Sequence, residues 1–109
     1  MTEYEQDIVS IISSSGESKA KAFEALKYAK LGDFNKARVL LKESREIDLS
    51  AHRLQTELIQ KEFDETSTKT PITLLMVHAQ DHYMTSQLAR DLIEYLIDIF
   101  ETQEKGSKS

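Results

Sequence analysis

Two short interruptions divide a chain that otherwise keeps the helical spacing of its apolar residues. The first is centred on Gly32 and the second on Thr70 and Pro71, in a sequence of 109 residues that holds 3 Gly and 1 Pro. Glycine commonly follows the last turn of a helix, and proline fits the first turn, where its missing amide would have no partner. With so few of either residue, the chain favours long helices over a strand-and-turn fold, and the two breaks predict three helices.

The first two helices are predicted to form a tight hairpin. Thr2 followed by Glu5 is typical of a capping box, which begins a helix that runs to about Leu31. Gly32 ends this helix, and Asp33 can accept hydrogen bonds from the free amides that start the next one. The second helix is expected to fade near residue 63.

Each of these two helices carries a seam of apolar and small residues, three and four positions apart. The seam of the first helix is small in its middle, where Gly16 follows three serines and leaves room for a local kink. The first seam comprises Ile8, Ile11, Ser15, Ser18, Ala22, Ala25 and Ala29, and the second Ala37, Leu40, Ser44, Ile47, Ala51, Leu54 and Leu58.

The third helix is predicted to follow the polar connection "DETSTKT", with Thr70 as its N-cap and Pro71 in its first turn. We expect it to run to about Glu101. The polar residues 104–109 have nothing to bury and are expected to form a disordered tail, which leaves 1–103 as the domain. Three helices with short links predict an all-α fold, an antiparallel up-down-up three-helix bundle.

The third helix differs from the others because it carries two adjacent seams. The inner seam comprises Leu75, Ala79, His82, Ser86, Ala89, Ile93, Leu96 and Phe100, and the outer seam Leu74, His78, Asp81, Thr85, Leu88, Leu92, Tyr95 and Ile99. A single helical hairpin would not cover so wide an apolar surface. The excess predicts self-association, and a closed cyclic oligomer in particular.

Composition narrows the functional classes. The chain has no cysteine, which excludes a disulfide framework and a thiolate zinc site. Its formal net charge of -5 argues against nucleic acid and anionic membranes as partners, and no apolar run is long enough to span a bilayer. The amino terminus lacks the apolar core of a secretory signal, so we expect a soluble cytoplasmic protein.

The stretch "LLMVHAQDHYMTS" sets His78, Asp81 and His82 into this apolar pattern. At about 100° per residue, His78 shares a face with both of the others, whereas Gln80 points toward a flank. Buried polar groups cost free energy unless they are paired or used in chemistry. Three ionisable groups within five residues therefore indicate a functional site more than a structural one.

The residues alone leave four interpretations open. The cluster could fix the register of a bundle core, as a buried polar residue does in a coiled coil. It could bind metal, because H-x-x-D-H is similar to the inverted zinc-protease motif, although only His52 is available as a third ligand. It could hold a phosphorylatable histidine, oriented by a carboxylate one turn away. A non-enzymatic helical adaptor or a metal-binding regulatory bundle is the remaining alternative.

The sequence resembles the enzyme IIA component of the lactose/cellobiose (N,N'-diacetylchitobiose) family of the bacterial sugar phosphotransferase system. The resemblance covers nearly the whole chain and rests on "GDFNKA", "AHRLQTELIQKE" and above all "PITLLMVHAQDHYMTS". Tyr83 departs from the leucine or methionine expected at its position. Alanine at position 79 favours the cellobiose or oligo-β-glucoside branch over the lactose branch.

This resemblance implies that the protein is a phosphotransferase component of a phosphoenolpyruvate-dependent system that takes up a β-linked disaccharide. His78 would take a phosphoryl group from phospho-HPr and pass it to a cysteine of enzyme IIB. The protein would be a homotrimer in which Asp81 of each subunit meets the others at the axis, around a divalent cation, Mg²⁺. Gln80 and His82 match positions that line the site.

Overall fold

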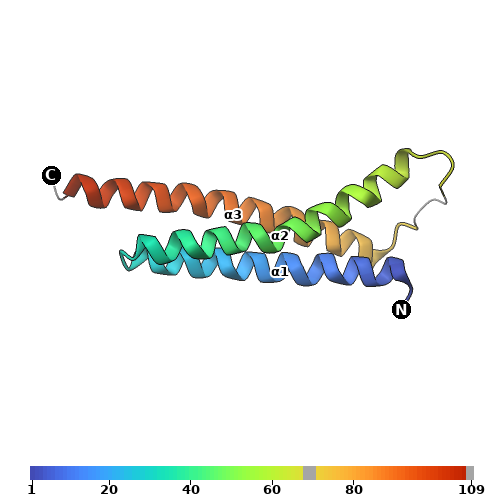
Figure 1. Cartoon of the computed structure of the whole chain (residues 1–109), viewed down its shortest axis with the longest axis horizontal. Coiled ribbons are helices and arrows are strands. Elements are labelled where there is room, and N and C mark those ends of the chain that lie inside the picture. The colour runs from blue at the N-terminus through green and yellow to red at the C-terminus, as the bar shows by residue number, and fades with distance from the viewer. Residues whose placement is uncertain (68–70, 108–109) are drawn as a thin grey trace.

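The computed structural model, which describes residues 1–67 and 71–107, is a bundle of three long helices. They are α1 (Glu3–Lys30), α2 (Phe34–Phe63) and α3 (Leu74–Ser107). Figure 1 shows that α1 and α3 run in one direction and α2 in the other. The predicted all-α, antiparallel up-down-up bundle is confirmed.

The predicted hairpin between α1 and α2 is also confirmed. The Glu5 amide donates to Thr2 Oγ1 at 3.1 Å and the Thr2 amide donates to Glu5 Oε1 at 3.3 Å, which completes the capping box. Gly32 has a φ of 85°, a left-handed conformation that strains any residue with a Cβ. Asp33 Oδ1 accepts from the Lys36 amide at 3.1 Å and so caps α2.

The start of α3 differs from the prediction. Thr70 lies outside the described residues, and Pro71 precedes the helix instead of occupying its first turn. Thr73 caps the helix, because its Oγ1 accepts from the Met76 amide at 3.1 Å. The Pro71 carbonyl is engaged elsewhere, accepting from the Tyr4 hydroxyl at 2.6 Å. This bond ties the connection to the first turn of α1.

The end of α3 also differs, because the helix continues to Ser107 and includes residues that were expected to be disordered. Glutamine, glutamate and lysine, which follow Glu101, are good helix formers, so local propensity carries the helix onward. Glu104 lies against the hairpin turn, with its carboxylate next to Gly32. Local propensity and the position of Glu104 beside the turn both favour helix past the predicted end.

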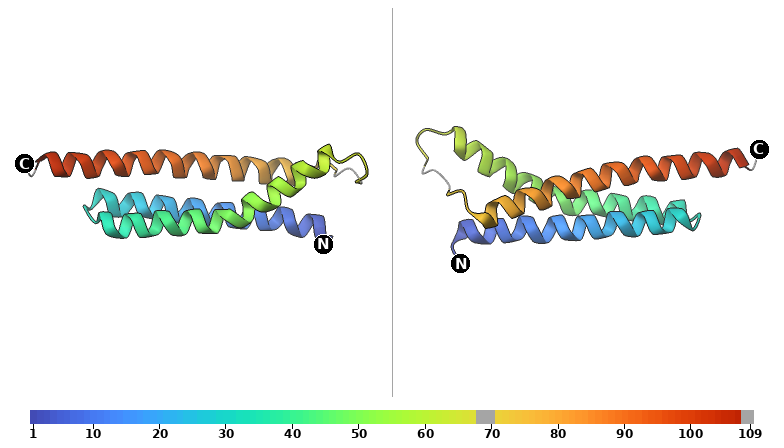
Figure 2. Two further views of the ribbon diagram at one scale, coloured as in Figure 1. Left: turned by 45° about the horizontal axis from the view of Figure 1, so that its top comes forward. Right: turned by 180° about the vertical axis from the view of Figure 1, so that it is seen from behind.

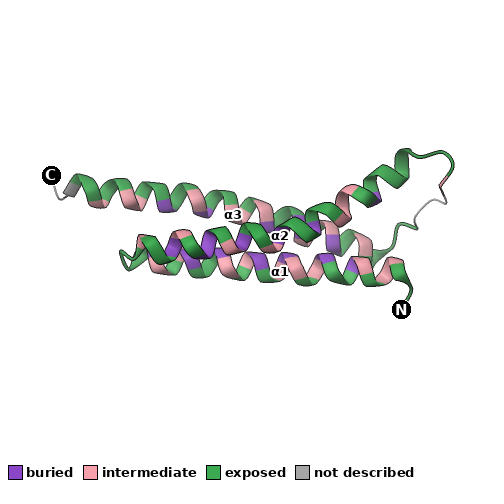
Figure 3. Cartoon of the chain, in the orientation of Figure 1, coloured by how far each residue is buried: buried purple, intermediate pink, exposed green. Residues whose placement is uncertain are grey.

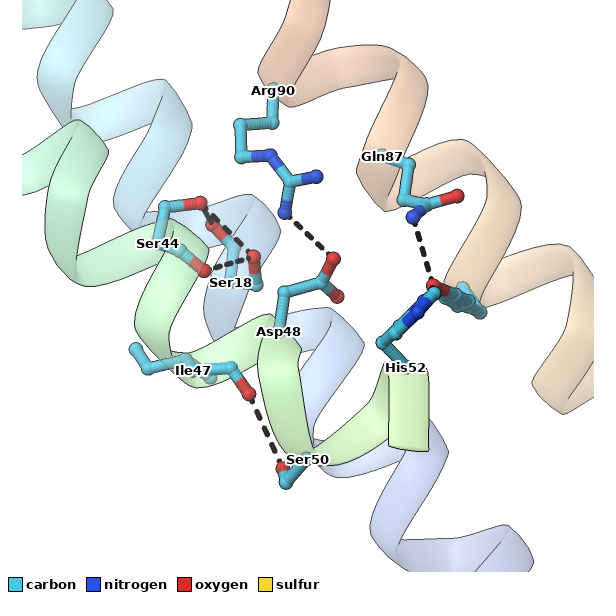
Figure 4. A network of polar contacts seen from close by, with 9 residues as sticks. Ser18, Ser44, Ile47, Asp48, Ser50, His52, Gln87 and Arg90 are labelled. Atoms are coloured by element: carbon cyan, nitrogen blue, oxygen red, sulfur yellow. Dashed lines mark hydrogen bonds and ion pairs between the residues drawn. The ribbon is translucent and has the colours of Figure 1, made fainter. Parts of the chain in front are cut away.

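The core consists of two apolar clusters along α1, and Figure 3 shows buried positions alternating with exposed ones along the helices. Every residue of the seam predicted for α1 is buried, and the helix passes through Gly16 without a break. Fully buried serines lie between the clusters. Ser18 and Ser44 each donate a hydroxyl proton to the other's backbone carbonyl, at 2.8 and 2.7 Å, which brings α1 and α2 close together (Figure 4).

The seam of α2 departs from its prediction near the middle of the helix. Ile47 and Leu54 are only partly buried, whereas the acidic Asp48 is buried. The reason lies on α3, where Arg90 Nη1 meets Asp48 Oδ2 at 2.6 Å. α1 supplies apolar residues to both clusters, and polar side chains span the gap between α2 and α3. The last turns of α2 bend away from α1 (Figures 1 and 2).

None of the helices, over the residues that the structure describes, is both long and apolar enough to cross a membrane.

Candidate functional site

His78 and His82 lie together near the start of α3, as the helical spacing predicted. Their ring centroids are 4.5 Å apart and the rings meet edge to face, at an interplanar angle of 85°. His78 is exposed, whereas His82 is partly buried and its Nδ1 has no hydrogen-bond partner among the described residues. The His78 side chain is therefore accessible from solvent, and its ring packs edge to face with the ring of His82.

Asp81 lies between the histidines in sequence and points to solvent. Its carbonyl accepts a hydrogen bond from Thr85 Oγ1 at 2.7 Å, but within the described part of the chain its carboxylate has no hydrogen bond and no ion pair. A charged carboxylate among the exposed leucines of the outer seam is unusual on a surface that packs against nothing in one chain.

Exposure separates the two seams of α3. Leu74, Leu88, Leu92, Tyr95 and Ile99 of the outer seam are between 49% and 85% exposed, and His78, Asp81 and Thr85 on the same seam are exposed as well. Ala79, Ser86 and Ile93 of the inner seam are buried in the bundle. The inner seam is buried only in part, because Leu75 and Leu96 are 37% and 38% exposed, whereas Tyr83 and Ile97 are buried although they lie on neither predicted seam. The outer seam packs against nothing within the chain.

Two hollows flank the outer seam. Leu74, Leu75 and His78 line the first, which we call the His78 hollow. The second, the Gln80 hollow, lies between the end of α2 and the start of α3, and it is largely apolar. Its lining residues are Leu58, Ile59, Glu62, Ile72, Met76, Val77, Gln80 and Asp81.

Gln80 is turned away from His78 and toward α2. Its Oε1 accepts from Gln55 Nε2 at 2.6 Å, and its own Nε2 lies 3.8 Å from the Met76 sulfur. The structure thus brings His78 and His82 together but does not bring Gln80 to them within one chain. Sequence reasoning placed Gln80 on a flank and missed Gln55, whose place in "AHRLQT" gives no sign of its partner.

A second polar contact joins α2 to α3 one turn farther from the start of α3. The buried Tyr83 hydroxyl lies 2.6 Å from His52 Nδ1 and accepts from Gln87 Nε2 at 2.8 Å. Because Gln87 donates to the Tyr83 hydroxyl oxygen, the Tyr83 hydroxyl can donate its own proton to His52 Nδ1. Burial raises the pKa of Tyr83, and the nearby Asp48 charge adds to that rise while Arg90 opposes it. His52 is thus engaged in the fold, away from the histidine pair.

A buried ion pair of Asp48 and Arg90 also joins α2 to α3 (Figure 4). Their side chains are only 4% and 14% exposed, and Asp48 Oδ1 and Arg90 Nε have no partner in the described structure. A sequence signal for this pair did exist, since an acid interrupts the apolar face of α2 and an arginine interrupts that of α3. Spacing alone could not show that the two interruptions meet.

Metal binding by one chain alone finds no support. Among residues 1–67 and 71–107, no group of three or more histidine, cysteine, aspartate or glutamate side chains could hold a metal ion.

Comparison with known proteins identifies the relatives of this site. The family model described as "PTS system, Lactose/Cellobiose specific IIA subunit" matches residues 6–101. The chain belongs to this family. As a IIA component it is a phosphotransferase component of a sugar phosphotransferase system.

Sequence relatives span several sugar specificities within the IIA family. The N,N'-diacetylchitobiose-specific EIIA component of Escherichia coli strain K12 is 43% identical over 99 residues, which cover 91% of this chain and 84% of that protein. The lichenan-specific enzyme IIA component of Bacillus subtilis strain 168 is 42% identical over 107 residues, with 96% of both chains covered.

Solved IIA structures share the fold. The cellobiose-specific enzyme IIA from Bacillus anthracis has a TM-score of 0.89 and 37% identity, covering 96% of this chain and 94% of that one. The IIA(chitobiose) chain of the Escherichia coli IIA–HPr complex has a TM-score of 0.79 and 41% identity, covering 95% of this chain and 99% of that one.

Proposed function

We propose that His78 carries a phosphoryl group from phospho-HPr to a cysteine of enzyme IIB during uptake of a β-linked disaccharide of the cellobiose, oligo-β-glucoside or lactose class. The observation that carries this proposal is the exposed His78 ring, held edge to face against His82 at the rim of an apolar hollow. The solved complex of a 41% identical IIA chain with HPr supports phospho-HPr as the donor.

The chemistry needs little beyond positioning. An unprotonated ring nitrogen of His78 attacks phosphorus, a nitrogen–phosphorus bond forms, and the bond from phosphorus to the donor breaks. In the second step a thiolate of enzyme IIB attacks the same phosphorus, and the nitrogen–phosphorus bond breaks to return the free imidazole. Phosphoryl transfer relies on alignment and charge stabilisation, so a rigid helical face is sufficient.

We further propose that three copies pack their outer seams around one axis, which Asp81 faces. The exposed leucines of this seam support the proposal, because burying them removes apolar surface from water. Three carboxylates at an axis would repel one another, and an all-oxygen set of this kind suits Mg²⁺. The unpartnered Asp81 carboxylate fits such a shared site, in which the cation would neutralise the three charges.

This arrangement also explains how Gln80 could line the site although it points away from His78 of its own chain. On a helical wheel with Asp81 at the axis, His78 lies about 60° to one side and Gln80 about 100° to the other. In a cyclic assembly one flank of each subunit meets the opposite flank of its neighbour. His78 of one subunit would then face the Gln80 hollow of the next, so Gln80 supports the site from across the interface and His82 from within the same chain.

The test of the carrier role is phosphorylation in a reconstituted system. With phosphoenolpyruvate, enzyme I and HPr, we expect one acid-labile phosphoryl group per chain, which is lost in His78→Ala. His52→Ala is the matched control, because it removes a histidine outside the pair and should be labelled like the wild type. Undiminished labelling of His78→Ala would overturn the assignment, and an unlabelled wild-type chain would favour a non-enzymatic adaptor.

The test of the axial role compares Asp81→Leu with Asp91→Leu, an exposed aspartate of α3 outside the outer seam. Sedimentation and Mg²⁺ titration should show a trimer that binds Mg²⁺ in the wild type and in Asp91→Leu. Asp81→Leu should lose the ion yet keep or strengthen the trimer, because it removes repulsion and adds apolar surface. Unchanged ion binding in Asp81→Leu would refute the role of Asp81.

A further inference from the structure

The Gln55–Gln80 hydrogen bond joins a residue of α2 to a residue that flanks the proposed site. Gln55 Nε2 donates to Gln80 Oε1 at 2.6 Å, and both side chains are partly buried. A short bond between two flexible side chains restrains both of them. Gln55 itself does not line either hollow, so any influence on chemistry would pass through Gln80.

The direction of this hydrogen bond is set by the second neighbour of Gln80. The Met76 sulfur lies 3.8 Å from Gln80 Nε2, and a thioether can only accept. The amide nitrogen of Gln80 therefore faces Met76, and its oxygen must face Gln55, which has to donate. The second hydrogen of the Gln80 amide group has no acceptor among the described residues, and Gln80 is one of the residues that line the Gln80 hollow.

The surroundings of that amide hydrogen strengthen its electrostatic interaction with an anionic group. Leu58, Ile59, Ile72 and Val77 make the hollow largely apolar, and the acidic Glu62 and Asp81 also line it, so Gln80 is the residue of this lining that can offer an amide donor to an anionic group. A fixed donor in such surroundings stabilises developing negative charge more than the same donor in water. In the proposed cyclic assembly, the hollow faces His78 of the neighbouring subunit.

We propose that Gln55 is a positioning residue for phosphoryl transfer. By donating to Gln80 Oε1 it keeps the Gln80 amide hydrogen directed at the phosphoryl oxygens on His78 of the adjacent subunit. Without Gln55 the Gln80 amide turns freely and presents its oxygen for part of the time, which repels the phosphoryl group. This inference rests on the proposed carrier function of His78.

The experiment measures the rate of His78 labelling by excess phospho-HPr in a single turnover. Gln55→Leu should react about tenfold more slowly than the wild type, because a misdirected donor forfeits part of its transition-state stabilisation. Gln55→Glu should also be slow, because a carboxylate can only accept and draws the Gln80 amide hydrogens to itself. Gln60→Glu adds the same charge at an exposed position of α2 and should keep the wild-type rate.

A double-mutant cycle separates positioning from a general structural effect. If Gln55 acts through Gln80, then Gln55→Leu will add no further slowing in a Gln80→Leu background. An undiminished effect in that background, or a wild-type rate for Gln55→Leu, would overturn the inference. Circular dichroism and thermal melting check that each variant is folded. If Gln55→Leu does not fold, the rate of Gln55→Glu serves as the test instead. An unlabelled wild-type chain would instead refute the carrier function itself.

Discussion

Replacing Asp48 by alanine tests how α2 is held to α3. The Asp48 and Arg90 side chains are 4% and 14% exposed, and their contact is a single 2.6 Å bond between Oδ2 and Nη1. Removing Asp48 leaves a nearly buried guanidinium without a counter-charge. The loss of one partner of a buried ion pair costs about 3 to 5 kcal/mol of unfolding free energy.

We expect the lower end of that range, about 3 kcal/mol, because the Asp48–Arg90 contact is not bidentate and Arg90 can turn its head toward solvent. For a chain of this size the change corresponds to a fall of roughly 12 °C in Tm. Circular dichroism during thermal and urea unfolding measures both quantities. Protein concentration must be held fixed, since association of the chain would itself raise Tm.

Two further variants decide whether the ion pair is the cause. Glu43→Ala breaks the Lys21–Glu43 pair, whose side chains are 34% and 44% exposed, and it should cost less than about 1 kcal/mol. The double substitution Asp48→Leu with Arg90→Leu removes both charges and should lie within about 1 kcal/mol of the wild type. The reasoning is refuted if Asp48→Ala costs no more than Glu43→Ala.

Three other predictions follow from the described contacts. Gly32→Ala should lower the unfolding free energy by about 1 kcal/mol, measured by urea unfolding, because Gly32 has a φ of 85°. Thr2→Ala should cost about 1 kcal/mol by loss of the capping box, and Ser13→Ala on the same helix should not. Because the pKa of Tyr83 is raised in the folded chain, the unfolded chain loses the Tyr83 hydroxyl proton at a lower pH. The free energy of unfolding should therefore fall as pH rises above about 10. In thermal melts at alkaline pH, Tyr83→Phe should show a smaller fall.

Features that depend on residues close together in the sequence match the structure best. The capping box at Thr2, the hairpin at Gly32 and the buried seam of α1 were predicted correctly, because each depends on residues within one or two turns. The start of α3 was predicted wrongly, since the Pro71 carbonyl accepts a hydrogen bond from Tyr4 and Thr73 caps the helix. The end of α3 was predicted too early, since the helix formers after Glu101 continue it to Ser107 and Glu104 lies beside Gly32 in the folded chain.

The candidate site divides in the same way. The pairing of His78 with His82 follows from their four-residue spacing and was predicted from it. The contact of Gln80 with Gln55 was not predicted, because it joins positions 25 residues apart. Helical periodicity fixes the angle at which a side chain leaves its helix, but not which neighbouring helix it meets.

The sequence by itself determined the three helices and the buried face of α1, because these are set by spacing along one chain. Only the tertiary structure showed that the packed face of α3 is shifted from the predicted inner seam and includes Tyr83 and Ile97, because both predicted seams have apolar residues at the same spacing. It also decided that polar side chains join α2 to α3, with Asp48 buried against Arg90 and Gln80 held by Gln55. These pairs depend on the relative rotation of packed helices, which the order of residues does not fix.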